Sequence, residues 1–179
     1  MKHHPCNYFQ TKDLGKLKYF LGIEVAQSND DIVISQMKYA FDIFEKTGLM
    51  NSNFVDILMD PNTKFLPNQG EPMSNLEQYR RLGGKLNYLT ITCLIISFAI
   101  SVVSQFLNSL YEDHWNAIIH ISKYIKGSPR KGLFYGSNNH TRVVCYSDVD
   151  CTRSPSDIGS IFEYCVSFSS NLISWKNKK

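Results

Sequence analysis

The sequence predicts an α+β fold, in which a β-hairpin is followed by a small helical region and then by an antiparallel β-sheet. Apolar and polar residues alternate in residues 17–27 and 32–34, which is typical of paired strands. The middle of the chain instead repeats apolar residues every three to four positions, the period of a helix. Alternation returns in short runs after residue 131. The order strands, helices, strands favours an α+β arrangement.

The composition is that of a globular chain without a disulfide framework. The chain has 179 residues, of which 43% are hydrophobic, enough for a buried core in one or two small domains. Its formal net charge of +3 permits contact with nucleic acid without requiring it. The five cysteines include no Cys-x-x-Cys pair, so we interpret them as reduced thiols of an intracellular protein. No secretory signal follows Met1, which favours the same compartment.

The first predicted elements are a hairpin and a helix. Residues 17–27 form the expected first strand, residues 28–30 a turn, and residues 32–34 the return strand. Ser35 is positioned to cap the helix that follows, and Gly48 stands where a left-handed residue commonly ends one. The apolar positions of this helix follow the spacing i, i+3, i+4, i+7: Met37, Ala40, Phe41 and Phe44.

An irregular connector, residues 51–72, leads to the second predicted helix. Ser74 and Glu77 fit a capping box at its start. Gly83 and Gly84 inside this helix should each cost about 1 kcal/mol relative to alanine, and a close helix crossing would be one compensation.

Residues 86–111 carry no charge, which raises the question of a membrane span. Polar residues interrupt the most apolar part of this run, residues 89–107, whereas a span needs about 20 predominantly apolar residues. We therefore favour a helix buried on most sides. The next helix is predicted at residues 112–126, with acids in its first turn, lysines in its last turn and Gly127 as the residue after it.

The predicted final sheet has four strands: residues 131–136, 141–150, 160–168 and 172–175. Residues 137–140 are expected to form a hairpin turn between the first two. The second strand ends in Asp148 and Asp150, at a position where metal-dependent nucleases hold Mg²⁺. An isolated Asp-x-Asp is more often a strand end that starts a turn, so the metal assignment depends on further acids.

Basic residues of the helical region are candidate phosphate contacts: Arg80, Arg81, Lys85, Lys123 and Lys126. With a net charge of only +3, an ordinary solvated surface is an equal alternative. Other metal-site patterns are weak. His3, His4 and Cys6 lie at the terminus, and His114 and His120 are six apart, on different sides of a helix.

Seven segments, in this order, resemble the Pol polyproteins of Ty1/copia-type LTR retrotransposons, and the copies in plant genomes are most similar. They are residues 12–24 (Lys-Asp-Leu-Gly-Lys-Leu-Lys-Tyr-Phe-Leu-Gly-Ile-Glu), 35–39 (Ser-Gln-x-Lys-Tyr), 79–90 (Tyr-Arg-Arg-Leu-x-Gly-Lys-Leu-x-Tyr-Leu-Thr), 96–99 (Ile-Ser-Phe-Ala), 124–128 (Tyr-Ile-Lys-Gly-Ser), 146–150 (Tyr-Ser-Asp-x-Asp) and 171–176 (Asn-Leu-Ile-Ser-Trp-Lys). The resemblance covers nearly the whole chain.

The resemblance implies three regions. Residues 1–50 correspond to the end of the reverse transcriptase palm and the first thumb helix. Residues 51–130 correspond to a connector and a helical thumb/connection region. Residues 131–179 correspond to the truncated N-terminal part of an RNase H-like domain, so the antiparallel sheet there is expected to be incomplete.

The resemblance also implies roles for individual residues. Phe20, Leu21 and Gly22 correspond to the primer-grip motif and would contact nucleic acid. Asp148 corresponds to the first catalytic carboxylate of RNase H, and with Asp150 it would hold Mg²⁺, the metal that the parent family uses.

The chain departs from the family pattern in ways that affect catalysis. It contains no Tyr-x-Asp-Asp motif, and residues 92–96 are Thr-Cys-Leu-Ile-Ile where the family has Thr-Arg-Pro-Asp-Ile. The segment that carries the next RNase H acid would follow Lys179. Two-metal hydrolysis needs several carboxylates around ions about 3.5–4 Å apart. We therefore expect Asp148 to be vestigial, with weak Mg²⁺ binding at best, and we expect no cofactor in this chain.

The first functional hypothesis is a Pol fragment, related to RNA-directed DNA synthesis and to RNA–DNA hybrid cleavage, that is non-catalytic by itself. The alternative is a domesticated module that binds nucleic acid or protein. A third hypothesis is an RNase H completed by another chain. The expected partner is an RNA–DNA hybrid or template–primer, with no membrane and no small-molecule substrate. The final sheet is expected to expose an apolar face that no helix covers.

Overall fold

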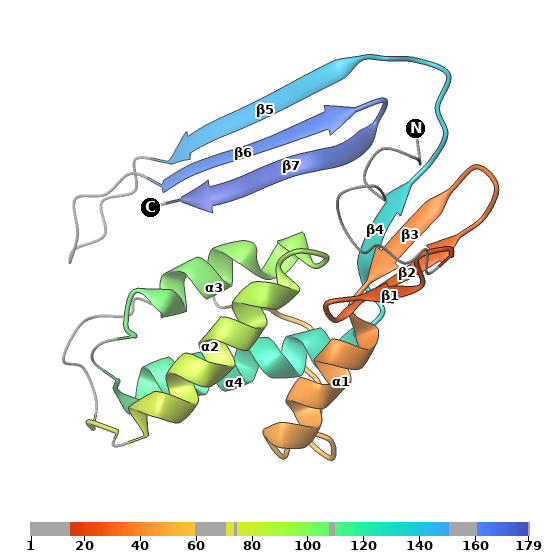
Figure 1. The fold of residues 1–179 in the computed structure, drawn as a ribbon. Coiled ribbons are helices and arrows are strands. Elements are labelled where there is room, and N and C mark those ends of the chain that lie inside the picture. The colour runs from red at the N-terminus through yellow and green to blue at the C-terminus, as the bar shows by residue number, and fades with distance from the viewer. Residues whose placement is uncertain (1–14, 60–70, 74, 108–109, 151–160, 179) are drawn as a thin grey trace, which may run out of the picture.

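The computed structural model describes residues 15–59, 71–73, 75–107, 110–150 and 161–178. Two antiparallel sheets lie next to a group of helices (Figure 1). The elements, in chain order, are β1 (Tyr19–Phe20), β2 (Ile23–Gln27), β3 (Ile32–Ser35), α1 (Met37–Lys46), α2 (Leu76–Leu89), the 3-10 helix η2 (Leu94–Ile96), α3 (Ser97–Ser104), α4 (Glu112–Gly127), β4 (Gly132–Tyr135), β5 (Val143–Asp150), β6 (Ile161–Phe168) and β7 (Asn171–Lys178).

The first sheet has the strand order β1-β2-β3-β4, and all neighbours are antiparallel. β4 comes from far along the chain, and its Gly132 lies opposite Ser35 of β3. A Cβ atom at Gly132 would collide with the carbonyl oxygen of Ile34, so glycine permits this close pairing. Because β3 leads into α1 and β4 follows α4, the sheet joins the two ends of the helical region.

Two predictions for these strands are wrong. Residues 17–27 do not form one strand, because the chain reverses at Leu21 and Gly22, where φ is 48° and 79°. Residues 137–140 do not connect a hairpin, because β4 pairs with β3 and β5 pairs with β6. Alternation of apolar residues identifies strand-forming sequence, but it specifies neither the partner nor the position of a turn.

The start of α1 also differs from the prediction, whereas its end agrees with it. The residue before the helix is Gln36, and Ser35 belongs to β3, where its hydroxyl donates to Oε2 of Glu24 at 3.4 Å. Gly48 has a φ of 69° and follows the helix as predicted. Leu49, the next residue, is buried in the core.

α1, α2, α3 and α4 pack around one apolar core. α2 begins after Asn75, whose side-chain oxygen accepts the N–H of Gln78, and the predicted cap Ser74 lies outside the described residues. The predicted close approach is confirmed at Gly83, where a Cβ atom would lie 3.5 Å from Cδ1 of Ile118 on α4. The largest fully buried apolar side chains include Ile43, Phe44, Tyr79, Leu86, Ile96, Ile100, Ile118 and Ile121.

The uncharged run of residues 86–111 is not one buried helix. α2 ends at Leu89, and residues 90–93 turn into η2 and α3. Thr92 is buried in this turn, and its hydroxyl donates to Oε1 of Gln36 at 2.9 Å. Among the described helices, none has the length and apolar character needed to span a membrane.

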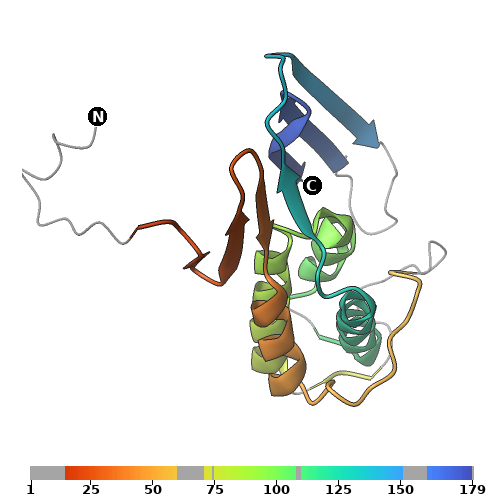
Figure 2. The ribbon, with the colours of Figure 1, turned by 90° about the vertical axis from the view of Figure 1, so that its right-hand side faces the viewer.

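The second sheet has the order β5-β6-β7 and lies beside α3, as Figures 1 and 2 show. The prediction that no helix covers this sheet is wrong for β7, which contacts α3, but large apolar side chains of the sheet, including Val143, Tyr146 and Ile173, are exposed. The β6–β7 turn has positive φ at Ser169 and Ser170. Asn138 Nδ2 donates to Ser169 O at 2.6 Å, and Asn171 bonds both backbone groups of Gly136 at 2.8 Å, which ties this turn to the end of β4.

Candidate functional site

The residues singled out from the sequence lie in two parts of the molecule. Phe20, Leu21 and Gly22 form the β1–β2 connection, where Phe20 pairs with Ile23 and the two residues between them turn the chain. Positive φ at both turn positions is the geometry of a tight two-residue hairpin. Phe20 is 59% exposed and Leu21 is 68% exposed. The turn therefore presents two large apolar side chains to solvent.

Two tyrosines from the helices hold this turn in place. The hydroxyl of Tyr88, on α2, donates to the carbonyl oxygen of Leu21. Tyr88 packs edge-to-face against Tyr39 of α1, with ring centroids 5.2 Å apart. A Cβ atom at Gly22 would lie 3.5 Å from Cδ2 of Tyr39, so the turn rests directly on this aromatic pair. Burial, and then the neighbouring Tyr88 and Asp42, raise the pKa of Tyr39.

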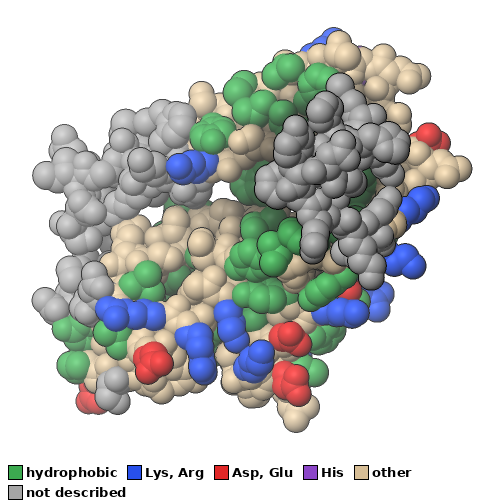
Figure 3. Space-filling model, viewed as in Figure 1, with side chains coloured by type: hydrophobic (Ala, Val, Ile, Leu, Met, Phe, Trp, Pro, Cys, Tyr) green, Lys and Arg blue, Asp and Glu red, His purple; other side chains and the backbone are tan. Residues whose placement is uncertain are grey.

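A basic surface lies on the adjoining helices. The pKa of Lys85 is lowered, first by partial burial and then by the positive charges of Lys46 and Arg81, with Asp42 opposing the shift. Lys46 of α1 and Arg81 of α2 therefore each lie close enough to Lys85 to influence its charge, and we name these three residues the α1–α2 basic face. Figure 3 shows Lys and Arg side chains across the helices toward the first sheet, with Asp and Glu side chains among them. Lys38 adds a cation at 5.7 Å from the centroid of the Tyr19 ring.

The other predicted basic contacts differ in their surroundings. Arg80 is exposed on α2, and its Nε donates to the carbonyl oxygen of Leu107 at 2.8 Å. Lys126 donates to three backbone carbonyls, of Leu49 at 2.9 Å and of Met50 and Ser52 at 2.5 Å each. An ammonium group has three protons, so these bonds use all of them.

Lys126 thus connects α4 to the chain that follows α1. Because all of its protons are engaged, we leave Lys126 out of the nucleic-acid interface. Lys123, half-buried on α4, does not belong to the α1–α2 basic face, and its contact with nucleic acid stays a prediction.

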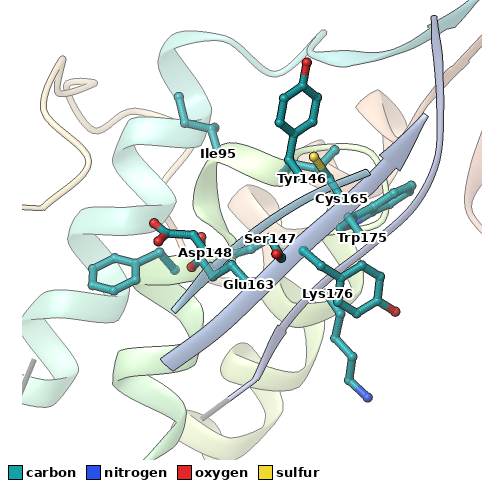
Figure 4. Close-up of a pocket in the computed structure, with 12 residues that line it drawn as sticks. Ile95, Tyr146, Ser147, Asp148, Glu163, Cys165, Trp175 and Lys176 are labelled. Carbon is teal, nitrogen blue, oxygen red and sulfur yellow. The ribbon is translucent and has the colours of Figure 1, made fainter. Parts of the chain in front are cut away.

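Asp148 lies on β5 in the second part of the molecule. It is exposed and directly opposite Glu163 of β6 in the strand register. Both acids line a cleft of about 550 Å³ between the second sheet and the η2–α3 segment. Figure 4 shows their side chains next to each other at one side of the cleft. Asp150 ends β5, but its side chain lies outside the described part of the structure.

Few described side chains near Asp148 could bind a metal ion. Within the described residues, no three His, Cys, Asp or Glu side chains are grouped so that they could hold a metal ion. Asp148 and Glu163 are a pair, whereas two bridged metal ions need more carboxylates. Among the described residues, these two acids therefore do not fit the metal centre of a two-metal nuclease.

Sequence reasoning missed Glu163, Lys46, Tyr39 and Tyr88 as members of these sites. Tyr88 lies inside one of the recognised segments, residues 79–90, which was the available signal for it. Glu163 had no such signal, because its position opposite Asp148 depends on the β5–β6 register.

Comparison with known proteins identifies relatives along almost the whole chain. The retrovirus-related Pol polyprotein from transposon RE1 of Arabidopsis thaliana is 33% identical over 171 residues, which are 96% of this chain and 12% of that protein. The Pol polyprotein from transposon TNT 1-94 of Nicotiana tabacum is 27% identical over 179 residues, covering 95% and 13%. The mitochondrial protein AtMg00810 of Arabidopsis thaliana is 28% identical over 177 residues, covering 96% and 71%.

No family model matches the chain, and no solved structure matches it significantly. The chain spans about one eighth of the length of the two polyproteins that it matches. The matches nevertheless cover both the hairpin and the second sheet, so they include every site described above. The chain therefore belongs to the family of Ty1/copia-type retrotransposon Pol polyproteins.

Proposed function

We propose that this chain is the part of a copia-type Pol polyprotein that joins the reverse transcriptase to RNase H. We further propose that it binds an RNA–DNA hybrid or template–primer and, by itself, neither extends nor cleaves it. In this assignment the β1–β2 turn is the primer grip, the helices are the thumb and connection, and the second sheet is the start of RNase H.

The observation that carries this proposal is that the exposed turn rests on Tyr39 and Tyr88, which belong to the same two helices as the α1–α2 basic face. Cations at the helix surface suit phosphate groups, whose neutralisation dominates the affinity of most nucleic-acid interfaces. An exposed aromatic such as Phe20 suits the unstacked end of a strand, because every base offers a π-face. Tyr88 and Tyr39 hold the turn in a fixed position relative to Arg81 and Lys85.

The proposed lack of catalysis rests on the small number of carboxylates that could bind metal ions. Asp148 and Glu163 alone cannot clamp two metal ions on either side of a phosphate. The sequence contains no Tyr-x-Asp-Asp motif for polymerisation.

Binding is tested with a fluorescently labelled RNA–DNA hybrid, by anisotropy between about 50 and 200 mM salt. We expect affinity to fall steeply with salt, and Arg81→Gln to weaken binding and reduce the logarithmic salt slope by about 1. Arg142→Gln removes an exposed arginine next to the second sheet and serves as the matched control. The absence of a salt-dependent anisotropy change, or equal effects of the two substitutions, would overturn the proposed interface.

The catalytic half is tested separately by incubating the chain with the labelled hybrid and Mg²⁺. We expect the RNA strand to stay intact. Release of RNA fragments that disappears in Asp148→Asn would show that the site is complete in solution, and the proposal of an inactive chain would then be wrong.

A further inference from the structure

Within the described part of the chain, β5 is an edge strand of the second sheet, whose order is β5-β6-β7. It is eight residues long, and Figure 1 shows it on the side of the sheet away from α3. Its exposed side chains include Val143, Cys145 and Tyr146. An edge strand of this length presents a row of backbone N–H and C=O groups with which a further strand can pair.

Two other edges of the sheets have features that discourage such pairing. β1, at the edge of the first sheet, has only two residues. β7, the opposite edge of the second sheet, contacts α3 and β4 and carries the exposed Lys176. Short strands, lysines and covering elements are common ways in which proteins protect an edge. β5, by contrast, has no lysine, proline or glycine.

The pairing of β5 with β6 determines which backbone groups of β5 face outward. The N–H of Ser169 donates to the carbonyl oxygen of Arg142 at 2.9 Å, and this pair continues the β5–β6 register by one residue. In an antiparallel ladder, successive residues direct their backbone groups alternately to one side of the strand and to the other. Arg142 and every second residue after it therefore face β6. The backbone groups of Val143, Cys145 and Ser147 face away from the sheet.

The sequence of β5 is complementary to itself when two copies run antiparallel with Cys145 at the centre. In this register Val143 lies opposite Ser147, so outward-facing backbone groups meet one another. Arg142 lies opposite Asp148 of the second copy, and by symmetry this pair occurs twice. Opposite charges on directly opposed residues stabilise a strand pair. Arg142 and Asp148 would occupy a non-hydrogen-bonded pair, in which side chains come closest.

The apolar side chains favour the same register. Val144 lies opposite Tyr146 of the second copy, and an aromatic residue across from a β-branched one is a stabilising cross-strand pair. The smallest shift that keeps the outward-facing groups opposed is two residues. Such a shift puts Asp148 opposite Val144 or His140, and both the Arg142–Asp148 and the Val144–Tyr146 pairs are lost.

We propose that this chain associates with a second copy of itself through β5, so that two three-stranded sheets become one continuous sheet across a two-fold axis. The same edge serves both copies, so association stops at the dimer. A single strand pair is smaller than the roughly 1,200 Å² of a standard interface, and the dimer is therefore weak. The proposed nucleic-acid interface uses the first sheet and the helices, so the two proposals are tested separately.

The dimer is tested by sedimentation velocity of the full chain in reducing buffer. Dimerisation depends on concentration by mass action, so the measurement extends from about 5 to about 500 µM protein. We expect the sedimentation coefficient to rise from that of a monomer toward that of a dimer. A monomer throughout this range, or species larger than a dimer, would overturn the proposal.

Charge reversal tests the register. Arg142→Glu and Asp148→Arg should each weaken dimerisation about tenfold, because like charges then lie opposite each other twice. An equimolar mixture of the two variants should dimerise about as well as the parent chain, because each introduced charge then meets its opposite. Arg130→Glu reverses an exposed charge outside β5 and is the matched control. If the mixture associated no better than either variant alone, Arg142 and Asp148 would not be opposed and the proposal would be wrong.

Cys145 allows a direct measurement of proximity. Directly opposed residues of a hydrogen-bonded pair have Cα atoms about 5.5 Å apart, so a short bismaleimide should link the two Cys145 thiols of a dimer. We expect Cys145→Ser to abolish the linked product and Cys165→Ser, on β6, to retain it. A product that persisted in Cys145→Ser and was lost in Cys165→Ser would place the contact elsewhere and refute pairing through β5.

Discussion

The hydroxyl of Tyr88 donates a hydrogen bond to the carbonyl oxygen of Leu21, and this contact joins α2 to a turn 67 residues earlier in the chain. The turn carries the apolar side chains that the resemblance assigns to the primer grip. The orientation of the turn is therefore set by α2 as well as by the hairpin itself. β1 is a strand of two residues at the edge of the four-stranded sheet, so the additional contact with α2 matters for a rigid surface.

We expect Tyr88→Phe to loosen the turn without unfolding the chain. Loss of one hydrogen bond should lower the free energy of unfolding by about 1 kcal/mol, measured in urea. Affinity for the RNA–DNA hybrid should fall several-fold, because the turn would have to be ordered upon binding. Tyr124→Phe, which alters a hydroxyl on α4 that accepts from Lys131, is the control and should leave hybrid affinity unchanged. If Tyr88→Phe bound the RNA–DNA hybrid as tightly as the parent chain, the turn would not be part of the nucleic-acid interface.

Elements with strong local signals could be predicted from the sequence. α4 has acids in its first turn and a lysine in its last, and its observed bounds, Glu112–Gly127, differ from the prediction by one residue. Gly48 likewise marks the end of α1 through its positive φ. β5, β6 and β7 were also predicted, because alternation in a short run is a local property.

The remaining features depend on contacts that no local pattern encodes. The turn at Leu21 requires positive φ in a leucine, which is rare, so the alternation was interpreted as a continuous strand. β4 pairs with β3 about 100 residues away in sequence, and the acid pair of Asp148 and Glu163 depends on the register between β5 and β6. The sequence therefore indicated one carboxylate of the second site and not its partner.

Lys126→Met should destabilise the chain strongly for a single lysine substitution. It leaves three carbonyls after α1 without their donor, and hydrogen bonds that involve a charged group are worth about 1.5–3 kcal/mol. We expect the free energy of unfolding to fall by about 2 kcal/mol in urea titrations. Lys123→Met, on the same helix, should change it by less than about 0.5 kcal/mol.

Lys126→Met and Lys123→Met also test whether Lys126 stabilises the fold or contacts nucleic acid. Hybrid affinity of the folded Lys126→Met protein should equal that of the parent chain. If Lys126→Met instead weakened the salt dependence of hybrid affinity and left the free energy of unfolding unchanged, Lys126 would belong to the nucleic-acid interface.

Two glycines should respond to alanine in opposite directions. Gly84 is exposed inside α2, with open space where a Cβ would lie, so Gly84→Ala should raise the free energy of unfolding by about 1 kcal/mol. At Gly132 a Cβ collides with backbone of β3, so Gly132→Ala should lower it by about 1–3 kcal/mol. Thermal unfolding followed by circular dichroism gives the order Gly84→Ala, parent, Gly132→Ala. A stable Gly132→Ala protein would contradict the β3–β4 pairing.

Buried tyrosines should make the fold sensitive to alkali. Tyr79 is fully buried, its hydroxyl donates to the carbonyl oxygen of Val103 at 2.7 Å, and burial raises its pKa well above the usual range. Burial is also the main cause that raises the pKa of Tyr39 and Tyr135. An unfolded phenol titrates near about pH 10. The stabilisation by each neutral phenol is therefore intact below that pH and is lost as the pH rises toward the folded-state pKa.

We accordingly expect the free energy of unfolding to decline above about pH 10, with up to about 1.4 kcal/mol per pH unit from Tyr79 and smaller contributions from the half-exposed Tyr39 and Tyr135. Tyr79→Phe should be less stable at neutral pH, because the carbonyl of Val103 loses its donor, but its stability should decline less steeply in alkali. Urea midpoints measured from neutral pH into the alkaline range provide the comparison. Parallel curves for Tyr79→Phe and the parent chain would show that Tyr79 ionises equally easily in both states, contrary to its burial.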